Sequence, residues 1–298
     1  MFFDNFYNLL KKSDNGLSKC LVLGTSRIGL AIDSNELAEG IKWDSKQILK
    51  APISAGSAWE VVKLMNSEKE AFKDVKCIII DAEAYQFNDN CPTRFGHRFY
   101  RLANIKEKMI LANNWKEESV VMIDEIWPLL SDRRTLNEWF LGTFHYVSKG
   151  KWFIPMDKRW DKYEKNPELF QEEMFDPKIA AKRHMEKYSY SFFMERTWEE
   201  LVNICNQRGI SLTIIIPPAK REFVEALQAE KDWETGYKQM MKFLKSLDRY
   251  PLVNVIITET FADIGYIDDE TFFIDYGHMS HKGAIIYSCW LSKKISYR

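Results

Sequence analysis

The sequence lacks a large net charge, a long hydrophobic run and a regular cysteine spacing, and each absence excludes a class of protein. Its 298 residues contain 42 lysines and arginines against 43 aspartates and glutamates. Proteins that bind nucleic acid usually carry a clear basic excess or patch, so this balance argues against such a partner. No run reaches the roughly 18 to 20 apolar residues that cross a bilayer, so we expect no membrane span.

The cysteines and the amino terminus predict a cytoplasmic location. No CxxC spacing occurs among the five cysteines, which are Cys20, Cys77, Cys91, Cys205 and Cys289. An odd set of this kind indicates reduced thiols in a reducing compartment, with neither a disulfide scaffold nor a zinc knuckle. The opening MFFDNFYNLLKK has no basic region ahead of its apolar residues, so we expect no signal peptide. Because no HExxH motif or similar ligand cluster is present, we expect neither a metal nor a cofactor.

Five short apolar runs predict the strands of a parallel sheet. Their hydrophobicity is continuous rather than alternating, which is typical of strands buried on both faces. The runs are residues 19–23, 47–49, 75–81, 211–216 and 252–258. Helical patterns lie between them, at residues 58–65, 198–207 and 222–247. This alternation predicts one α/β domain over residues 1–298, with a doubly wound sheet and a ligand site beyond the carboxyl ends of its strands.

Residues 90–195 interrupt the alternation of strands and helices. The segment has no convincing parallel strand, is largely helical in pattern and is rich in tryptophan and tyrosine. A segment of this length cannot be a bare loop in a compact domain, so we expect a packed helical insertion, or cap. Its aromatic side chains either fill a core of their own or line a substrate cleft. Three isolated histidines in it, His97, His145 and His184, are expected to be surface or satisfied polar residues.

The first predicted strand ends in GTSRIG, which raises the question of what Ser26 does. A dinucleotide fingerprint needs a glycine at the place of Ser26, because a side chain there would crowd the pyrophosphate. No Gly-Lys-Ser/Thr follows, so a P-loop is excluded as well. A serine at a strand-to-helix turn is either a plain cap or a nucleophile exposed above the sheet.

A partner for Ser26 lies near the other end of the chain, in DYGHMSHKG. Asp275 stands three residues before His278, and a carboxylate at that spacing can orient an imidazole, fix its tautomer and stabilise its protonated form. His281 is the alternative base. The spacing from Asp275 and the glycine that follows, Gly283, favour His278.

Both blocks resemble those of the SGNH (GDSL-like) hydrolase superfamily. Residues 24–27, GTSR, resemble the GSSR-type first block of envelope-associated acyl-transfer members, and residues 275–283 are similar to the DxxHLNxxG last block. The resemblance covers residues 18–88 and 198–295. It implies a three-layer, flavodoxin-like sandwich around a five-stranded parallel sheet. It also implies that Ser26 is the nucleophile, His278 the base and Asp275 the orienting acid.

The resemblance further implies an oxyanion hole made by the backbone N–H groups of Ser26 and Gly56. The family's third donor is an asparagine in a GxND block, and here Glu83 stands in its place. An ionised carboxylate would oppose an oxyanion, so Gln86 or Asn88 is the expected replacement. One missing donor lowers the rate about 10² to 10³. Arg27, next to the nucleophile, is expected to bind an anionic substrate group or else to form a salt bridge on the helix surface.

The function that the resemblance implies is that of a serine esterase or O-acyltransferase. Its substrates would be small, acetyl-like acyl esters of a small molecule or a carbohydrate. The carbohydrate part depends on the resemblance and on the aromatic insertion. The alternative, which the missing asparagine suggests, is a catalytically inactive binding or scaffold protein on the same fold.

Overall fold

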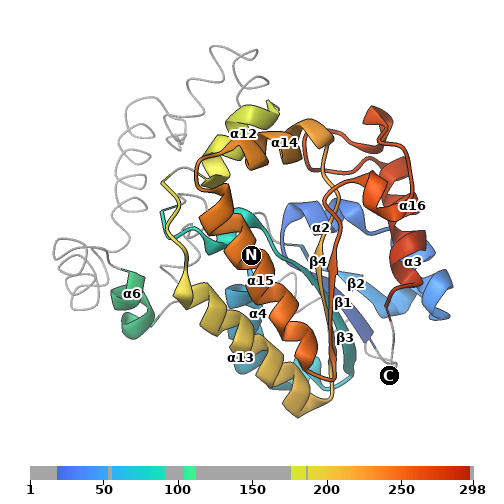
Figure 1. Ribbon diagram of the computed structural model, residues 1–298. Helices are drawn as coiled ribbons and strands as arrows, with labels where there is room; N and C mark the ends of the chain where they lie inside the picture. Colours follow the sequence, from blue (N-terminus) through green and yellow to red (C-terminus); the bar gives the residue numbers. More distant parts are fainter. Residues whose placement is uncertain (1–18, 53–55, 91–103, 112–175, 186, 296–298) are drawn as a thin grey trace, which may run out of the picture. The chain divides into compact units, whose positions relative to one another are not determined.

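A computed structural model describes most of the chain outside the predicted insertion (Figure 1). The described residues are 19–52, 56–90, 104–111, 176–185 and 187–295. The chain divides into two compact units, Met1–Arg94 with Phe175–Arg298, and Phe95–Met174. The second unit is described only around helix α6 (Ile105–Leu111). Most of the predicted insertion, with His97, His145 and Cys91, therefore lies outside the described residues, and its role as a cap stays a prediction.

Five strands form one sheet in which every pair of neighbours is parallel, in the order β2-β1-β3-β4-β5. The strands are β1 (Lys19–Leu23), β2 (Ile48–Lys50), β3 (Val75–Asp81), β4 (Ser211–Ile216) and β5 (Val253–Ile257). Every residue of β1 is buried, which explains its continuous apolar sequence. The predicted α/β class is confirmed, and each predicted strand lies within two residues of an observed one.

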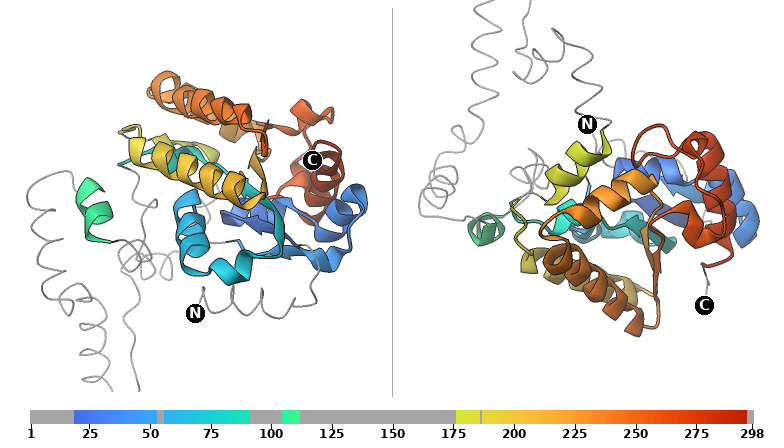
Figure 2. Two further views of the ribbon diagram at one scale, coloured as in Figure 1. Left: turned by 90° about the horizontal axis from the view of Figure 1, so that it is seen from below. Right: turned by 45° about the horizontal axis from the view of Figure 1, so that its top comes forward.

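Helices cover both faces of the sheet and complete a three-layer sandwich (Figures 1 and 2). On one face, α16 (His281–Ser292) packs against α2 (Ser26–Ala31) and α3 (Ser34–Ile41). On the other, α13 (Phe192–Arg208) packs against α4 (Ala58–Ser67). Buried residues of α2, α3 and α16, with those of β1, form a continuous hydrophobic cluster. This packing fixes α2, and therefore its first residue, against the end of β1.

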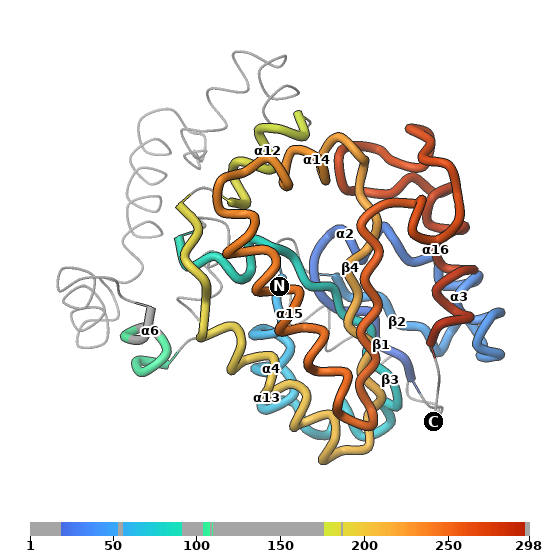
Figure 3. The backbone as a smooth tube through the Cα atoms, viewed as in Figure 1, coloured from blue at the N-terminus to red at the C-terminus, as the bar shows by residue number. Residues whose placement is uncertain are grey.

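The helix predicted over residues 222–247 is broken in the structure. It consists of α14 (Arg221–Ala229), a π-helical turn η4 (Trp233–Tyr237) and α15 (Lys238–Ser246). Within the turn, Gly236 lies against the ring of Tyr188, where an added Cβ would come within 2.6 Å of the ring. Helix α12 (Pro177–Met185) packs beside α14, as the backbone trace in Figure 3 shows.

Four cysteines are described, and no disulfide joins any two of them: Cys20, Cys77, Cys205 and Cys289. Within the described ranges no helix combines the length and the apolar character that crossing a membrane requires.

The topology brings several loops to the carboxyl edge of the sheet. From β1 the chain crosses to β2 on one side and then returns to β3 on the other side of β1. Ligand sites of doubly wound sheets lie at such a switch point. The polar residues that follow β1 and β3, and the loops after β4 and β5, meet at this edge.

Candidate active site

Ser26 is the first residue of helix α2, directly beyond the end of β1. Thr25 caps the helix, since its hydroxyl accepts a hydrogen bond from the backbone N–H of Arg27 at 3.0 Å. The backbone N–H of Thr25 donates to Oδ1 of Asp81 at 2.8 Å, and its hydroxyl donates to Oδ2. Gly24 makes the turn with a φ of +116°. The segment that carries Ser26 is thus held by the end of β3.

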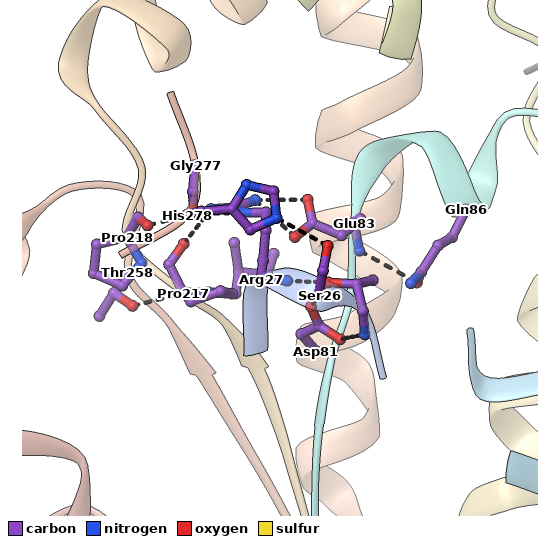
Figure 4. Close-up of polar contacts among 12 residues, drawn as sticks. Ser26, Arg27, Asp81, Glu83, Gln86, Pro217, Pro218, Thr258, Gly277 and His278 are labelled. Atoms are coloured by element: carbon purple, nitrogen blue, oxygen red, sulfur yellow. Dashed lines mark hydrogen bonds and ion pairs between the residues drawn. The ribbon is translucent and has the colours of Figure 1, made fainter. Parts of the chain in front are cut away.

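The ring of His278 points at the hydroxyl of Ser26 (Figure 4). Nε2 of His278 lies 2.8 Å from Oγ of Ser26, and Nδ1 lies 2.7 Å from Oδ2 of Asp275. An ionised carboxylate can only accept hydrogen bonds, so Nδ1 carries the ring proton and Nε2 can accept the proton of Ser26. The structure therefore brings together the three residues that the sequence assigns to a triad.

The ionised state of Asp275 has a clear physical cause. Burial raises the pKa of this carboxyl, but the hydrogen bonds from the His278 ring and from the backbone N–H groups of Gly277 and His278 lower it below its usual value. The loop is closed by the N–H of Ile274, which donates to the carbonyl oxygen of His278 at 2.8 Å. A short local turn therefore places acid and base side by side.

His281, the alternative base, lies elsewhere. It is the first residue of α16, its side chain is 81% exposed, and its ring nitrogen lies 3.8 Å from a carboxylate oxygen of Asp33. His278, in contrast, contacts both Ser26 and Asp275.

Arg27 forms a salt bridge, which was one of the two roles expected for it, but inside the protein and not on the helix surface. Its side chain is 8% exposed, and all three of its nitrogens donate hydrogen bonds to groups inside the protein. Nε donates to the carbonyl oxygen of Gly277 at 3.0 Å, and Nη1 donates to both carboxylate oxygens of Glu83 at 2.7 and 2.6 Å. Nη2 donates to the carbonyl oxygens of Pro217 and Pro218 at 2.9 and 3.2 Å. The salt bridge is therefore a buried one.

Neither Gln86 nor Asn88 replaces the missing oxyanion donor, because both are fully buried and their amides hold other groups. Nε2 of Gln86 donates to the carbonyl oxygen of Gly56 at 2.8 Å. Nδ2 of Asn88 donates to the carbonyl oxygen of His184 at 3.1 Å. The expected replacement is wrong, and the role of Gln86 is instead to hold the Gly56 peptide from the inside.

Two backbone donors remain as candidates for an oxyanion hole, the N–H groups of Ser26 and Gly56. An N–H in the first turn of a helix has no partner within that helix. None of the described residues accepts a hydrogen bond from either group. Gly56 directly precedes Ser57, the cap of α4, and is itself buried. Their function as oxyanion donors stays a prediction.

Sequence reasoning missed the buried carboxyl of Asp81. Burial, with the nearby charge of Glu83, raises the pKa of Asp81 to about 7, while the hydrogen bonds from Thr25 and the charge of Arg27 oppose this rise. The available clue was an acidic residue that ends an otherwise apolar strand predicted to be buried on both faces.

His184, expected to be a surface or satisfied polar residue, is neither. It is 8% exposed, and its Nδ1 has no hydrogen-bond partner among the residues that the structure describes. Its ring lies 5.5 Å from that of Phe223 and 6.5 Å from that of Tyr276, which sits between Asp275 and His278. Burial, with the positive charge of Arg27, lowers the pKa of His184 to about 3, so its ring is neutral. It packs behind the Asp275–His278 loop.

The part of the chain that the structure describes contains no group of three or more histidine, cysteine, aspartate or glutamate side chains placed to hold a metal ion.

No protein-family model matches the chain, and no curated protein matches it significantly. The interpretation of the site therefore depends on its own geometry.

Proposed function

We propose that this protein is a serine esterase or O-acyltransferase of the SGNH (GDSL-like) type, with Ser26 as nucleophile, His278 as base and Asp275 as orienting acid. One observation carries the proposal: Ser26 Oγ lies 2.8 Å from one ring nitrogen of His278, and the other nitrogen lies 2.7 Å from Asp275. Nucleophile, base and orienting acid in this order are the arrangement that activates a serine hydroxyl. The position of Ser26 just beyond β1 supports it further.

The reaction would proceed through an acyl-serine. Nε2 of His278 takes the hydroxyl proton as Ser26 Oγ attacks the acyl carbon, and Asp275 stabilises the imidazolium. The carbonyl oxygen becomes an oxyanion, which the N–H groups of Ser26 and Gly56 would stabilise. His278 then gives the proton to the departing alcohol. Water in an esterase, or a second hydroxyl in an acyltransferase, releases the acyl group with His278 again as base.

Small acyl groups such as acetyl are the proposed substrates, because the two sequence blocks resemble those of acyl-transfer members of the superfamily. A carbohydrate acceptor is proposed on the same resemblance. With Glu83 at the place of the third donor, and Gln86 and Asn88 engaged elsewhere, we expect a rate about 10² to 10³ below that of an enzyme with three donors.

A catalytically inactive scaffold is the second candidate, and the same lack of a third side-chain donor among the described residues favours it. Labelling with a fluorophosphonate probe and hydrolysis of p-nitrophenyl acetate distinguish the two. We expect the parent protein to be labelled and to hydrolyse the ester, and the Ser26→Ala variant to do neither.

Ser34→Ala is the matched control for this experiment, because Ser34 is also the first residue of a helix and is also partly buried. It should behave like the parent. A parent that is neither labelled nor active on acetyl or butyryl esters would favour the scaffold.

A further inference from the structure

The guanidinium of Arg27 joins four segments at the carboxyl edge of the sheet (Figure 4). Arg27 itself lies in the first turn of α2, beside the nucleophile. Its partners follow three other strands: Glu83 lies after β3, Pro217 and Pro218 after β4, and Gly277 in the loop beyond β5. One buried side chain therefore contacts every loop that builds the triad.

Gly277 lies between this guanidinium and the catalytic carboxylate. Its carbonyl oxygen accepts from Nε of Arg27 at 3.0 Å, and its N–H donates to Oδ1 of Asp275 at 2.9 Å. A Cβ added to Gly277 would lie 2.9 Å from Nε of Arg27, closer than real Cβ atoms come to a neighbour. The loop thus rests directly on the guanidinium, and a displaced Arg27 would move the peptide that orients Asp275.

Glu83 keeps the guanidinium in place. Both of its carboxylate oxygens accept from Nη1, and the two side chains are 8% and 4% exposed. A buried guanidinium without its carboxylate partner strongly destabilises the folded protein, because the charge loses its hydration and no opposite charge compensates for the loss. The positive charge of Arg27 also compensates the negative charge of Glu83, which would otherwise oppose an oxyanion.

We propose that Arg27 and Glu83 are positioning residues for Ser26, His278 and Asp275. The buried ion pair holds the Gly277 peptide, and through it the acid and the base, at hydrogen-bond distance from the nucleophile. This inference rests on the proposed function. It gives Glu83, which stands where the family has an asparagine, the role of holding Arg27 in place. Because the two side chains are buried and paired with each other, loss of the pair should lower kcat rather than raise KM.

The first test measures kcat and KM of Arg27→Lys and Glu83→Gln on p-nitrophenyl acetate, with melting temperatures. Lysine keeps the charge but cannot make the five hydrogen bonds of the guanidinium. We expect kcat to fall about 10- to 100-fold while KM stays within about twofold. The matched control is Arg221→Lys, because Arg221 also pairs with a carboxylate, that of Asp268, but its side chain is 59% exposed. It should change neither constant.

A second readout does not depend on turnover. The proton shared by Nδ1 of His278 and Asp275 should give a low-field proton NMR resonance, assigned by its loss in Asp275→Asn. We expect this resonance in the parent and in Arg221→Lys, and a shifted or lost resonance in Arg27→Lys. Gly277→Ala keeps every charge but places a methyl group against Arg27, so it should shift or remove the resonance as well. It takes the place of Arg27→Lys in the experiment if Arg27→Lys does not fold.

The outcomes separate the two proposals. Folded Arg27→Lys and Gly277→Ala variants with an unchanged resonance and unchanged kcat would overturn the positioning role. A parent that shows the resonance but hydrolyses no ester would overturn the proposed function instead, and the resonance of the variants would still decide the positioning role.

Discussion

The carboxylate of Asp275 holds His278 at two points. Oδ1 accepts the backbone N–H of His278 at 2.8 Å, and Oδ2 lies 2.7 Å from Nδ1 of its ring. The same carboxylate therefore fixes the loop and the ring that the loop carries. These hydrogen bonds also lower the pKa of Asp275 below its usual value, which favours the ionised carboxylate that accepts them.

The first prediction concerns this pair. Asp275→Asn should lower kcat about 10⁴-fold, because an amide neither stabilises the imidazolium nor fixes the required tautomer. His278→Ala should abolish turnover, since serine without its base is a weak nucleophile. Both are measured by ester hydrolysis with melting temperature as a folding control. His281→Ala is the matched control and should stay close to the parent, because that ring is 81% exposed and faces Asp33. A strong loss in His281→Ala alone would reverse the assignment of the base.

The second prediction concerns Asp81 and the pH dependence of stability. The pKa of this carboxyl is raised to about 7 in the folded chain, whereas an unfolded aspartate ionises near pH 3.9. Between about pH 4 and pH 7 the folded state therefore binds a proton that the unfolded state has lost. The stabilisation that this proton provides is fully present below about pH 4 and is lost as the pH rises through about 7.

Urea unfolding of the parent and of Asp81→Asn measures this effect. The free energy of unfolding of the parent, relative to that of the variant, should fall between about pH 4 and pH 7 and then level off. Its slope has an upper limit of about 1.4 kcal/mol per pH unit, because one proton is involved. A difference that does not change with pH, or that grows towards pH 8, would contradict the raised pKa.

The strands, and the meeting of Ser26, His278 and Asp275, could be predicted from the sequence because each has a local signal. Burial on both faces leaves a continuous apolar run, as in β1 and β4. Ser26 and His278 are 252 positions apart, but each lies in a short block whose residue types indicate its chemistry. The sheet then brings the two blocks together, since both follow carboxyl ends of parallel strands.

The role of Arg27 could not be predicted in this way. In the sequence it is a polar residue next to the proposed nucleophile, which suits substrate binding, and nothing in GTSRIG shows that it is buried. Its partners lie 56 to 250 positions away, so only the folded chain shows that Glu83 and Gly277 use its donors. The break between α14 and η4 escaped prediction as well, because the apolar spacing continues past Glu230, the residue whose extended backbone ends α14.

The third prediction tests the support of Gly56. Gln86→Glu keeps the size of the side chain but turns a donor toward the Gly56 carbonyl into a second acceptor. The two oxygens should repel, shift the Gly56 peptide and lower kcat about 10- to 100-fold if its N–H stabilises the oxyanion. Gln47→Glu is the matched control, because Gln47 also accepts a backbone N–H within a capping box but lies near the surface. Equal kcat values in the two variants would contradict the assignment of the Gly56 N–H to the oxyanion hole.

The last prediction concerns the turn before the nucleophile. Gly24 has a φ of +116°, and an added Cβ would come within 2.0 Å of Oδ1 of Asp81, the atom that holds the N–H of Thr25. Gly24→Ala should therefore lower the free energy of unfolding by at least about 2 kcal/mol and slow fluorophosphonate labelling of Ser26 more than about tenfold. Gly209→Ala is the matched control, since Gly209 has a φ of +64° but nothing within 4 Å of the added atom. It should cost only about 1 to 2 kcal/mol, the strain of a left-handed residue, and leave labelling unchanged. If both variants label at the parent's rate, the contact between Gly24 and Asp81 does not position Ser26.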